Sequence, residues 1–202
     1  MQPDHIILAT HNQGKLVELQ SMMCAAGLGH ITLKNAADYN LSAPEETADS
    51  FEGNALIKAR FVAEQTGRAA LADDSGLCVD ALNGDPGVYS ADWAGPAKDF
   101  DQAFHMIKER LEKNNVETDG ATAHFVCVLA YIDEAGNTHI FKGTSDGALH
   151  FPPRGQNGFG YDPIFVPHGE LRSFGEMSME EKETYSARGR AFAAFASYLK
   201  TL

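Results

Sequence analysis

The chain has 202 residues, and its 16 basic against 28 acidic residues give a formal net charge of −12. This length, with 44% hydrophobic residues, predicts one globular domain spanning residues 1–202. The negative charge argues against nucleic acid or an anionic membrane as a partner, because both are polyanions, but it leaves a small anionic ligand possible. The sequence has no run of roughly 18–20 apolar residues and no signal-peptide pattern. Its three cysteines are not closely spaced, so we expect reduced thiols in a cytoplasmic protein.

The first half of the sequence alternates between predicted strands and helices. Residues 5–10 form a short apolar run that indicates a buried strand, and helical spacing of apolar residues follows Gly14 and stops near Gly27. Asp49 and Glu52 resemble a capping box, which predicts a helix that begins at Asp49 or Ser50. The remaining elements expected here are a strand at 31–33, the end of the second helix at Gly67, a strand at 69–72 that ends at Asp73-Asp74, and an extended segment at 77–82.

The second half contains the longest strand signal, at residues 121–132, and a turn that predicts a hairpin with 138–141. Apolar residues at helical spacing indicate further helices at 100–114, near 178, and at 190–202. The interleaving of strands and helices predicts an α/β fold with a mixed central sheet and flanking helices.

The segment Thr10-His11-Asn12-Gln13-Gly14-Lys15 has the features of an anion site. A strand end, a glycine-containing turn, a lysine and a helix start together offer backbone N–H groups, the positive end of a helix and a full positive charge. The spacing differs from that of the P-loop, so the same residues also fit an ordinary turn with a solvated lysine.

Two pairs of adjacent carboxylates are candidates for a metal site. Asp73-Asp74 follows an apolar strand, and the carboxyl ends of strands are where open α/β sheets bind ligands. Glu45-Glu46 lies in a polar loop and alone would be an exposed acidic segment. Carboxylates suit Mg²⁺, which takes one or two of them together with water and phosphate oxygens.

The segment from Gly155 to Pro163 is rich in glycine and contains Phe159 and Tyr161. Glycines allow the backbone to approach a ligand closely, and the two aromatic rings offer faces on which a flat base could stack. Lys182 and Arg188 add two cations further along the chain. An isolated loop of this kind is usually only a turn, and its significance here depends on the other motifs in the same chain.

These motifs together resemble, nearly end to end, the non-standard purine nucleoside triphosphate pyrophosphatases, the inosine triphosphatase-like or XTP/dITP diphosphatase family. The matching blocks are Ala9-Thr10-x-Asn12-x-x-Lys15-x-x-Glu18, Phe51-Glu52-Gly53-Asn54-Ala55-x-x-Lys58-Ala59, Ala72-Asp73-Asp74-Ser75-Gly76-Leu77, Pro86-Gly87-Val88-Tyr89-Ser90-Ala91 and Asn157-Gly158-Phe159-Gly160-Tyr161-Asp162-Pro163-Ile164-Phe165.

The resemblance implies an elongated α/β fold with two lobes around an active-site cleft, usually as a homodimer. It implies Mg²⁺-dependent hydrolysis of ITP, dITP and XTP to the monophosphate and pyrophosphate. By position, residues 10–15 would hold the triphosphate, Glu46 and Asp74 would lie at the metal, and Asp74 would be the base for water. The nucleotide site would be lined by Ser75, Phe159, Gly160, Tyr161, Asp162, Lys182, Ala187 and Arg188.

One position departs from the family pattern. Where the family reads Ser-His-Arg-Gly, this chain reads Ser186-Ala187-Arg188-Gly189. Selection of a 6-oxo purine over adenine needs hydrogen-bond donors, and alanine has none in its side chain. Either Arg188, Lys182 and backbone N–H groups carry the recognition, or the range of purines is altered.

Two other functions remain open from the sequence. The first is a related pyrophosphatase that prefers another modified or pyrimidine nucleotide, since phosphate-binding residues do not define the base. The second is a nucleotide-binding sensor that has lost turnover. The presence of Asp74, Glu46 and Lys15 argues against a sensor, because clustered acids beside a triphosphate would weaken simple binding.

Overall fold

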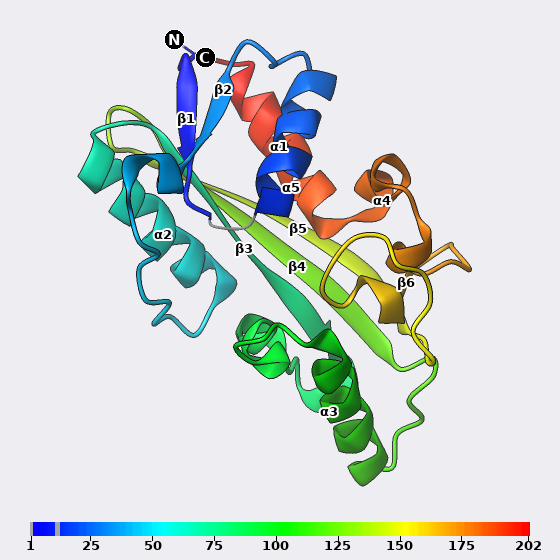
Figure 1. The fold of residues 1–202 in the computed structure, drawn as a ribbon. Coiled ribbons are helices and arrows are strands. Elements are labelled where there is room, and N and C mark those ends of the chain that lie inside the picture. The colour runs from blue at the N-terminus through cyan, green and yellow to red at the C-terminus, as the bar shows by residue number, and fades with distance from the viewer. Residues whose placement is uncertain (1, 11–12) are drawn as a thin grey trace. The chain divides into compact units, whose positions relative to one another are not determined.

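The computed structural model of the protein describes residues 2–10 and 13–202 (Figure 1). The strands in this part of the chain are β1 His5–Leu8, β2 Thr32–Asn35, β3 Ala70–Val79, β4 Thr122–Ile132, β5 Thr138–Leu149 and β6 Phe165–Pro167. The α-helices are α1 Gln13–Ala25, α2 Phe51–Thr66, α3 Phe100–Lys113, α4 Met179–Tyr185 and α5 Ala187–Leu199. Short 3₁₀ helices lie at Ala36–Tyr39, Asp80–Leu82, Gly87–Tyr89, Asp92–Ala94, Asp162–Ile164 and Phe174–Glu176.

The strands form a sheet in the order β2-β1-β3-β4-β5-β6. β1 is parallel to β2 and β3, whereas β5 is antiparallel to β6. The prediction of a mixed α/β sheet with flanking helices is therefore confirmed. The chain divides into two compact units: unit 1 contains Met1–Asp74, Cys127–Gly143 and Gly189–Leu202, and unit 2 contains Ser75–Val126 and Thr144–Arg188.

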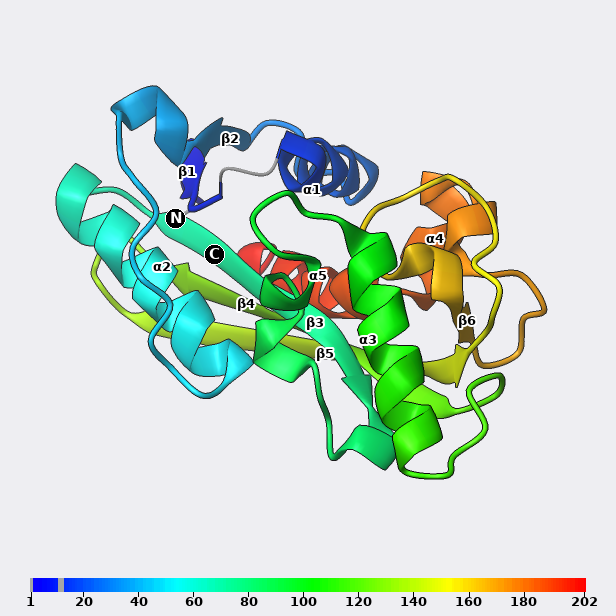
Figure 2. The same ribbon diagram turned by 60° about the horizontal axis from the view of Figure 1, so that its bottom comes forward.

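In unit 1, the order of the parallel strands determines where the first two helices lie. The chain moves from β1 outward to β2 and then returns past β1 to β3. Because β-α-β crossovers are right-handed, reversing direction places the two connecting helices on opposite faces. Figures 1 and 2 show this arrangement, with α1 on one side of the β1–β3 strands and α2 on the other. The point of reversal is where open α/β sheets bind ligands.

Local sequence explains the ends of α2. The Ser50 side chain accepts a hydrogen bond from the Gly53 N–H at 3.2 Å, and Gly67 ends the helix with a φ of 62°. The prediction of Gly67 as the stop is confirmed, but the cap is Ser50 and the capping box expected from Asp49 and Glu52 was wrong. The buried face of α2 carries Ala55, Ala59 and Val62 and also, unusually, Asn54 and Lys58.

Strand β3 continues through the polar segment at which the sequence predicted its end. Asp73 and Asp74 lie inside the strand and are buried, at 2% and 7% exposure. Successive side chains on a strand point to opposite faces, so the two aspartates face different helices. The prediction that the strand ends at these aspartates was wrong, because lysines from other elements pair with both carboxylates and allow the strand to continue.

Unit 2 has its own hydrophobic core. The N-terminus of α3 is capped by Asp99, which accepts hydrogen bonds from the N–H groups of Asp101 and Gln102. The apolar face of the helix, with Phe104, Ile107 and Leu111, packs into this core. Trp93 belongs to the same core.

Helix α5 packs in unit 1 through aromatic contacts with β4 and β5. The ring of Phe195 lies 5.4 Å from that of Tyr131, and the ring of Tyr198 lies 5.6 Å from that of Phe141. None of the helices described is both long enough and apolar enough to span a membrane.

Candidate functional site

Unit 1 brings Lys15 of the predicted phosphate loop to Asp73. The Lys15 ammonium lies 2.7 Å from a carboxylate oxygen of Asp73, whose side chain is 1% exposed. Thr10 is buried two residues after the end of β1, and Gln13 and Gly14 begin α1. His11 and Asn12, together with the side chain of Gln13, lie outside the described residues.

The two predicted metal carboxylates share a lysine on α2. The Lys58 ammonium donates to Asp74 Oδ1 at 2.8 Å and to Glu46 Oε1 at 3.2 Å. The side chains of Lys58 and Asp74 are about one-tenth exposed, whereas that of Glu46 is 44% exposed. Asp74 and Glu46 are therefore close together, as the sequence predicted, and a buried cation lies between them.

These charges change one another's protonation. Burial raises the pKa of Asp74 to about 6, although the Lys58 ammonium opposes the change. Burial works to lower the pKa of Lys58, but the carboxylates of Asp74, Asp73 and Glu46 outweigh it and raise the pKa above its ordinary value. Lys58 thus stays charged at neutral pH, and Asp74 is a carboxylate that takes up a proton more readily than an exposed one.

The carboxylates of Asp74 and Glu46 suit a magnesium ion whose other ligands are phosphate oxygens of a substrate and water. Oδ2 of Asp74 is buried and has no hydrogen-bond partner in the described part of the chain, so one carboxylate oxygen is available for a ligand. Within residues 2–10 and 13–202, no three His, Cys, Asp or Glu side chains cluster as a metal cage. Mg²⁺ needs no such cage, because it is commonly held by one or two carboxylates with phosphate oxygens and water.

Lys58 was missed as a site residue in the sequence, although a signal was present. It recurs with Ala55, Ala59 and Val62 at the spacing of one helical face, and all four are buried. A lysine on the apolar face of a helix needs a buried partner, because an unpaired buried charge is costly. The spacing alone could have singled it out.

Unit 2 brings together four of the predicted nucleotide-site residues. The Lys182 ammonium lies 2.6 Å from Asp162 Oδ2 and 4.6 Å from the centre of the Phe159 ring. The Arg188 guanidinium lies 5.5 Å from the same ring. Phe159 is 42% exposed, whereas Asp162, Lys182 and Arg188 are buried. The result is an aromatic face backed by two cations.

Tyr161 does not provide the stacking face that the sequence predicted. Tyr161 is 3% exposed, and its ring packs edge-on against Phe100, with 5.2 Å between the centroids. Its hydroxyl donates to the carbonyl of Ser90 at 2.8 Å, which satisfies the polar end inside the core. Tyr161 anchors the loop, and only Phe159 offers an exposed ring.

The glycines of this loop permit close contacts. Gly158 and Gly160 have φ of 73° and 66°, and a Cβ on Gly158 would collide with the Asp162 carboxylate. That carboxylate accepts a hydrogen bond from the Phe159 N–H at 2.8 Å. Asp162 therefore fixes the conformation of the loop as well as the position of Lys182.

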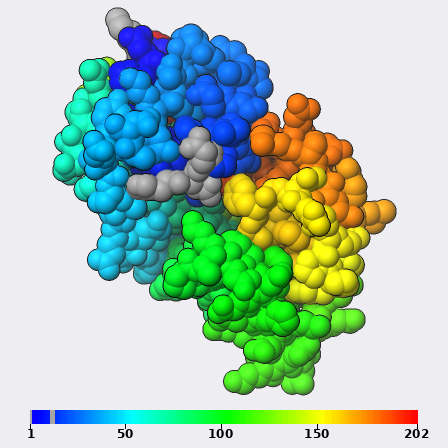
Figure 3. Space-filling view, viewed as in Figure 1, coloured from blue at the N-terminus to red at the C-terminus, as the bar shows by residue number. Residues whose placement is uncertain are grey.

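The loop also lines a cavity of about 300 Å³ within unit 2, bordered by the beginning of α3. Phe100 and Phe104 contribute apolar surface, and Lys98, Gln156 and Asn157 contribute polar groups. In Figure 3 the segment around residue 155 (yellow) lies at the surface of this unit.

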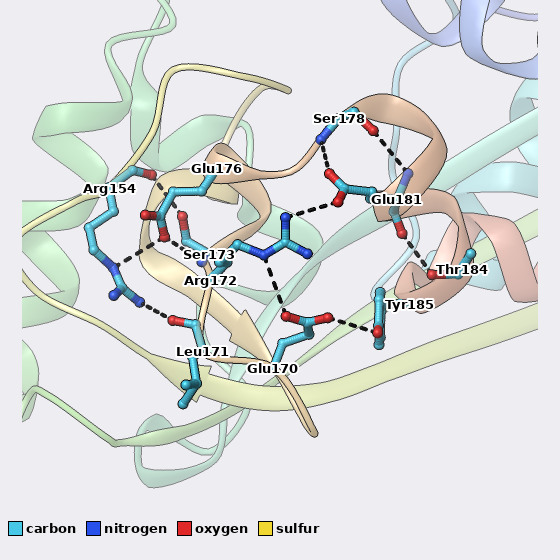
Figure 4. A network of polar contacts seen from close by, with 10 residues as sticks. All are labelled: Arg154, Glu170, Leu171, Arg172, Ser173, Glu176, Ser178, Glu181, Thr184 and Tyr185. Atoms are coloured by element: carbon cyan, nitrogen blue, oxygen red, sulfur yellow. Dashed lines mark hydrogen bonds and ion pairs between the residues drawn. The ribbon is translucent and has the colours of Figure 1, made fainter.

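Helix α4, which carries Lys182, is held by a polar network (Figure 4). Glu181 accepts hydrogen bonds from the Ser178 N–H at 2.8 Å and from Arg172 Nη1 at 2.9 Å. At the other end of the helix, the Tyr185 hydroxyl donates to Glu170 at 2.8 Å. A helix of seven residues is too short to persist alone, so these contacts position Lys182.

The remaining predicted residues lie at the boundaries of unit 2. Ser75 is its first residue, and its hydroxyl oxygen is 3.4 Å from Arg188 Nη2. Ala187 begins α5 and is 4% exposed. Because its side chain is a buried methyl group, it adds no polar group beside Arg188.

Comparison with known proteins identifies the family of the chain. The chain is 47% identical over 192 residues to a dITP/XTP pyrophosphatase from Zymomonas mobilis, covering 95% of this chain and 90% of the relative. It is 46% identical to a dITP/XTP pyrophosphatase from Caulobacter vibrioides, covering 96% and 97%. The structure of a HAM1 protein from Coxiella burnetii superposes with a TM-score of 0.88 at 37% identity, covering 98% of this chain and 99% of that protein. The Ham1 family model matches residues 6–198, and the chain belongs to the Ham1 family.

Proposed function

We propose that the protein hydrolyses non-standard purine nucleoside triphosphates, such as ITP, dITP and XTP, to the monophosphate and pyrophosphate. The observation that carries the proposal is Asp74, a buried carboxylate with one oxygen available and a pKa of about 6. The pyrophosphatase names of the relatives support the same reaction.

The charged residues of unit 1 suit the phosphate chemistry. Asp74 would orient the attacking water and accept its proton, a role that requires a carboxylate of raised basicity. Lys15 and Lys58 would bind the triphosphate oxygens. Glu46 and Asp74 would hold Mg²⁺, which when bound supplies positive charge to the phosphate oxygens.

The residues of unit 2 suit recognition of the base. Phe159 would stack on the purine, and the cationic donors of Lys182 and Arg188 would face a 6-oxo group. A 6-amino group presents hydrogens to these donors, so adenine would leave them unpaired. We further propose that the enzyme acts in the cytoplasm as a homodimer. Sedimentation analysis of the purified protein would test whether it forms a dimer.

The test is pyrophosphate release from ITP with Mg²⁺, compared with ATP, GTP, XTP and a pyrimidine triphosphate. We expect ITP and XTP to be cleaved, ATP to be cleaved far more slowly, and chelation of Mg²⁺ to stop turnover. Preference for a pyrimidine would identify a related enzyme of different specificity. Binding of ITP without release of pyrophosphate would identify a sensor.

Replacement of the proposed base tests the mechanism directly. Asp74→Asn keeps the shape of the side chain but removes the proton acceptor, so kcat should fall about 100-fold or more while the fold is retained. Asp49→Asn removes an exposed carboxylate from the same unit and serves as the matched control. Full activity of Asp74→Asn would remove Asp74 from this role.

A further inference from the structure

The ammonium of Lys58 is placed where it competes with a metal ion. It contacts Asp74 Oδ1 at 2.8 Å and Glu46 Oε1 at 3.2 Å, the two carboxylates assigned to Mg²⁺ above. A divalent cation bound by the same two side chains would lie within a few ångströms of this ammonium, where two positive charges repel strongly.

Lys58 cannot simply move aside into solvent. Its side chain is 11% exposed, and its stem leaves α2 on the face that buries Ala55, Ala59 and Val62. If the Lys58 ammonium left the carboxylates without gaining another anionic partner, it would be an unpaired buried charge, which is costly. A phosphate oxygen entering the site would be such a partner.

The second lysine of the cluster repeats this arrangement. Lys15 lies 2.7 Å from the buried carboxylate of Asp73. Both lysines assigned to the triphosphate are therefore neutralised by carboxylates of β3 in the free protein.

We propose that Lys58 is an internal counter-ion that keeps Mg²⁺ from binding until a triphosphate arrives. When both ligands bind, ion pairs are exchanged. Asp74 and Glu46 bind the metal in place of Lys58, and the Lys58 ammonium binds a phosphate oxygen in place of the two carboxylates. Mg²⁺ and the triphosphate consequently bind cooperatively, and each alone binds weakly. The proposal rests on the proposed function in taking Glu46 and Asp74 as the metal carboxylates.

The experiment measures Mg²⁺ binding to the whole, nucleotide-free protein by calorimetry at pH 8, with Mn²⁺ and electron paramagnetic resonance as a second probe. Lys58→Met and Lys58→Gln both remove the competing charge, and the amide of the second can still donate to Asp74. We expect each folded variant to bind Mg²⁺ at least about tenfold more tightly than the native protein. Lys34→Met, which removes an exposed lysine of β2 and changes the net charge equally, should bind like the native protein.

Circular dichroism establishes which variants are folded. The counter-ion proposal would be overturned if the Mg²⁺ affinity of every folded Lys58 variant rose by less than this, stayed equal to that of the native protein, or fell. Because this titration contains no nucleotide and measures no turnover, its failure is distinct from failure of the pyrophosphate-release assay on the native protein.

Discussion

At the scale of single residues, Ala187 is where this chain differs from the motif that it otherwise resembles. Its methyl group is buried at the start of α5, directly before Arg188. Lys182 and Arg188, the two cations to which we assign recognition of the base, are present and both contact the Phe159 ring. Any change in specificity should therefore be graded, because two donors remain when a third is missing.

Ala187→His should restore a hydrogen-bond donor and increase the preference for 6-oxo purines. One hydrogen bond to an uncharged partner is worth about 1 kcal/mol, so the kcat/KM ratio of ITP to ATP should rise about fivefold. The measurement is kcat/KM for ITP, XTP, GTP and ATP in both proteins. Unchanged rates and ratios would show that Ala187 has no part in selectivity.

Two features of single residues, the closeness of Glu46 to Asp74 and the burial of Tyr161, differ in how far the sequence could predict them. The closeness of Glu46 and Asp74 was predictable only from the family resemblance, because Glu45-Glu46 taken alone indicated an exposed acidic loop. The burial of Tyr161 was not, because an aromatic residue in a glycine-rich loop can face either a ligand or the core. Only the contacts with Phe100 and Ser90 decide between them.

At the scale of elements, α4 depends on its surroundings. It has seven residues, and its capping box and its ion pair with Arg172 both use the carboxylate of Glu181. A helix this short is stable only where tertiary contacts stabilise it, because too few hydrogen bonds within the helix offset the cost of nucleation. Lys182 follows Glu181 directly and inherits its position from these contacts.

Loss of the α4 cap should weaken nucleotide binding more than chemistry. Ser178→Ala removes an acceptor for the Glu181 N–H, which costs about 1 kcal/mol and should raise KM for ITP about fivefold, with kcat changed less than about twofold. Ser197→Ala, at an exposed position of α5, is the control. Steady-state kinetics with ITP would contradict this role for α4 if kcat fell and KM did not change.

The lengths of strands were less predictable than their existence. β3 runs without a break from Ala70 to Val79, where the sequence predicted a strand at 69–72 and a separate extended segment at 77–82. β5 continues to Leu149, beyond the predicted 138–141, and β6 was not predicted. Hydropathy patterns fail at such segments because neighbours in space, rather than in sequence, satisfy their polar groups. Lys15 and Lys58 do this for β3.

At the scale of the whole molecule, three strands belong to both compact units. The boundary between the units crosses β3 after Asp74, β4 after Val126 and β5 after Gly143. Unfolding one unit alone would release one end of each of these strands from its neighbours. The units should therefore be cooperative, as the predicted single domain requires.

We expect one thermal unfolding transition. Trp93, the only tryptophan, lies in the core of unit 2, so its fluorescence reports that unit, whereas far-ultraviolet circular dichroism reports both. The two midpoints should agree within about 2 °C if unfolding is two-state. A fluorescence transition clearly separated from the dichroism transition would show two independent domains.

The side-chain alternation of β3 has a consequence for Asp73 and Asp74. Adjacent identical residues are often regarded as redundant copies, yet these two belong to opposite faces of the sheet and pair with lysines of different helices. What distinguishes them is whether each lies at an odd or an even position along the strand, since that decides the face to which the side chain points. Deleting one residue between Ala70 and Asp73 would leave both aspartates in the sequence but turn each side chain to the opposite face of the sheet, so that neither would meet the lysine with which it pairs here.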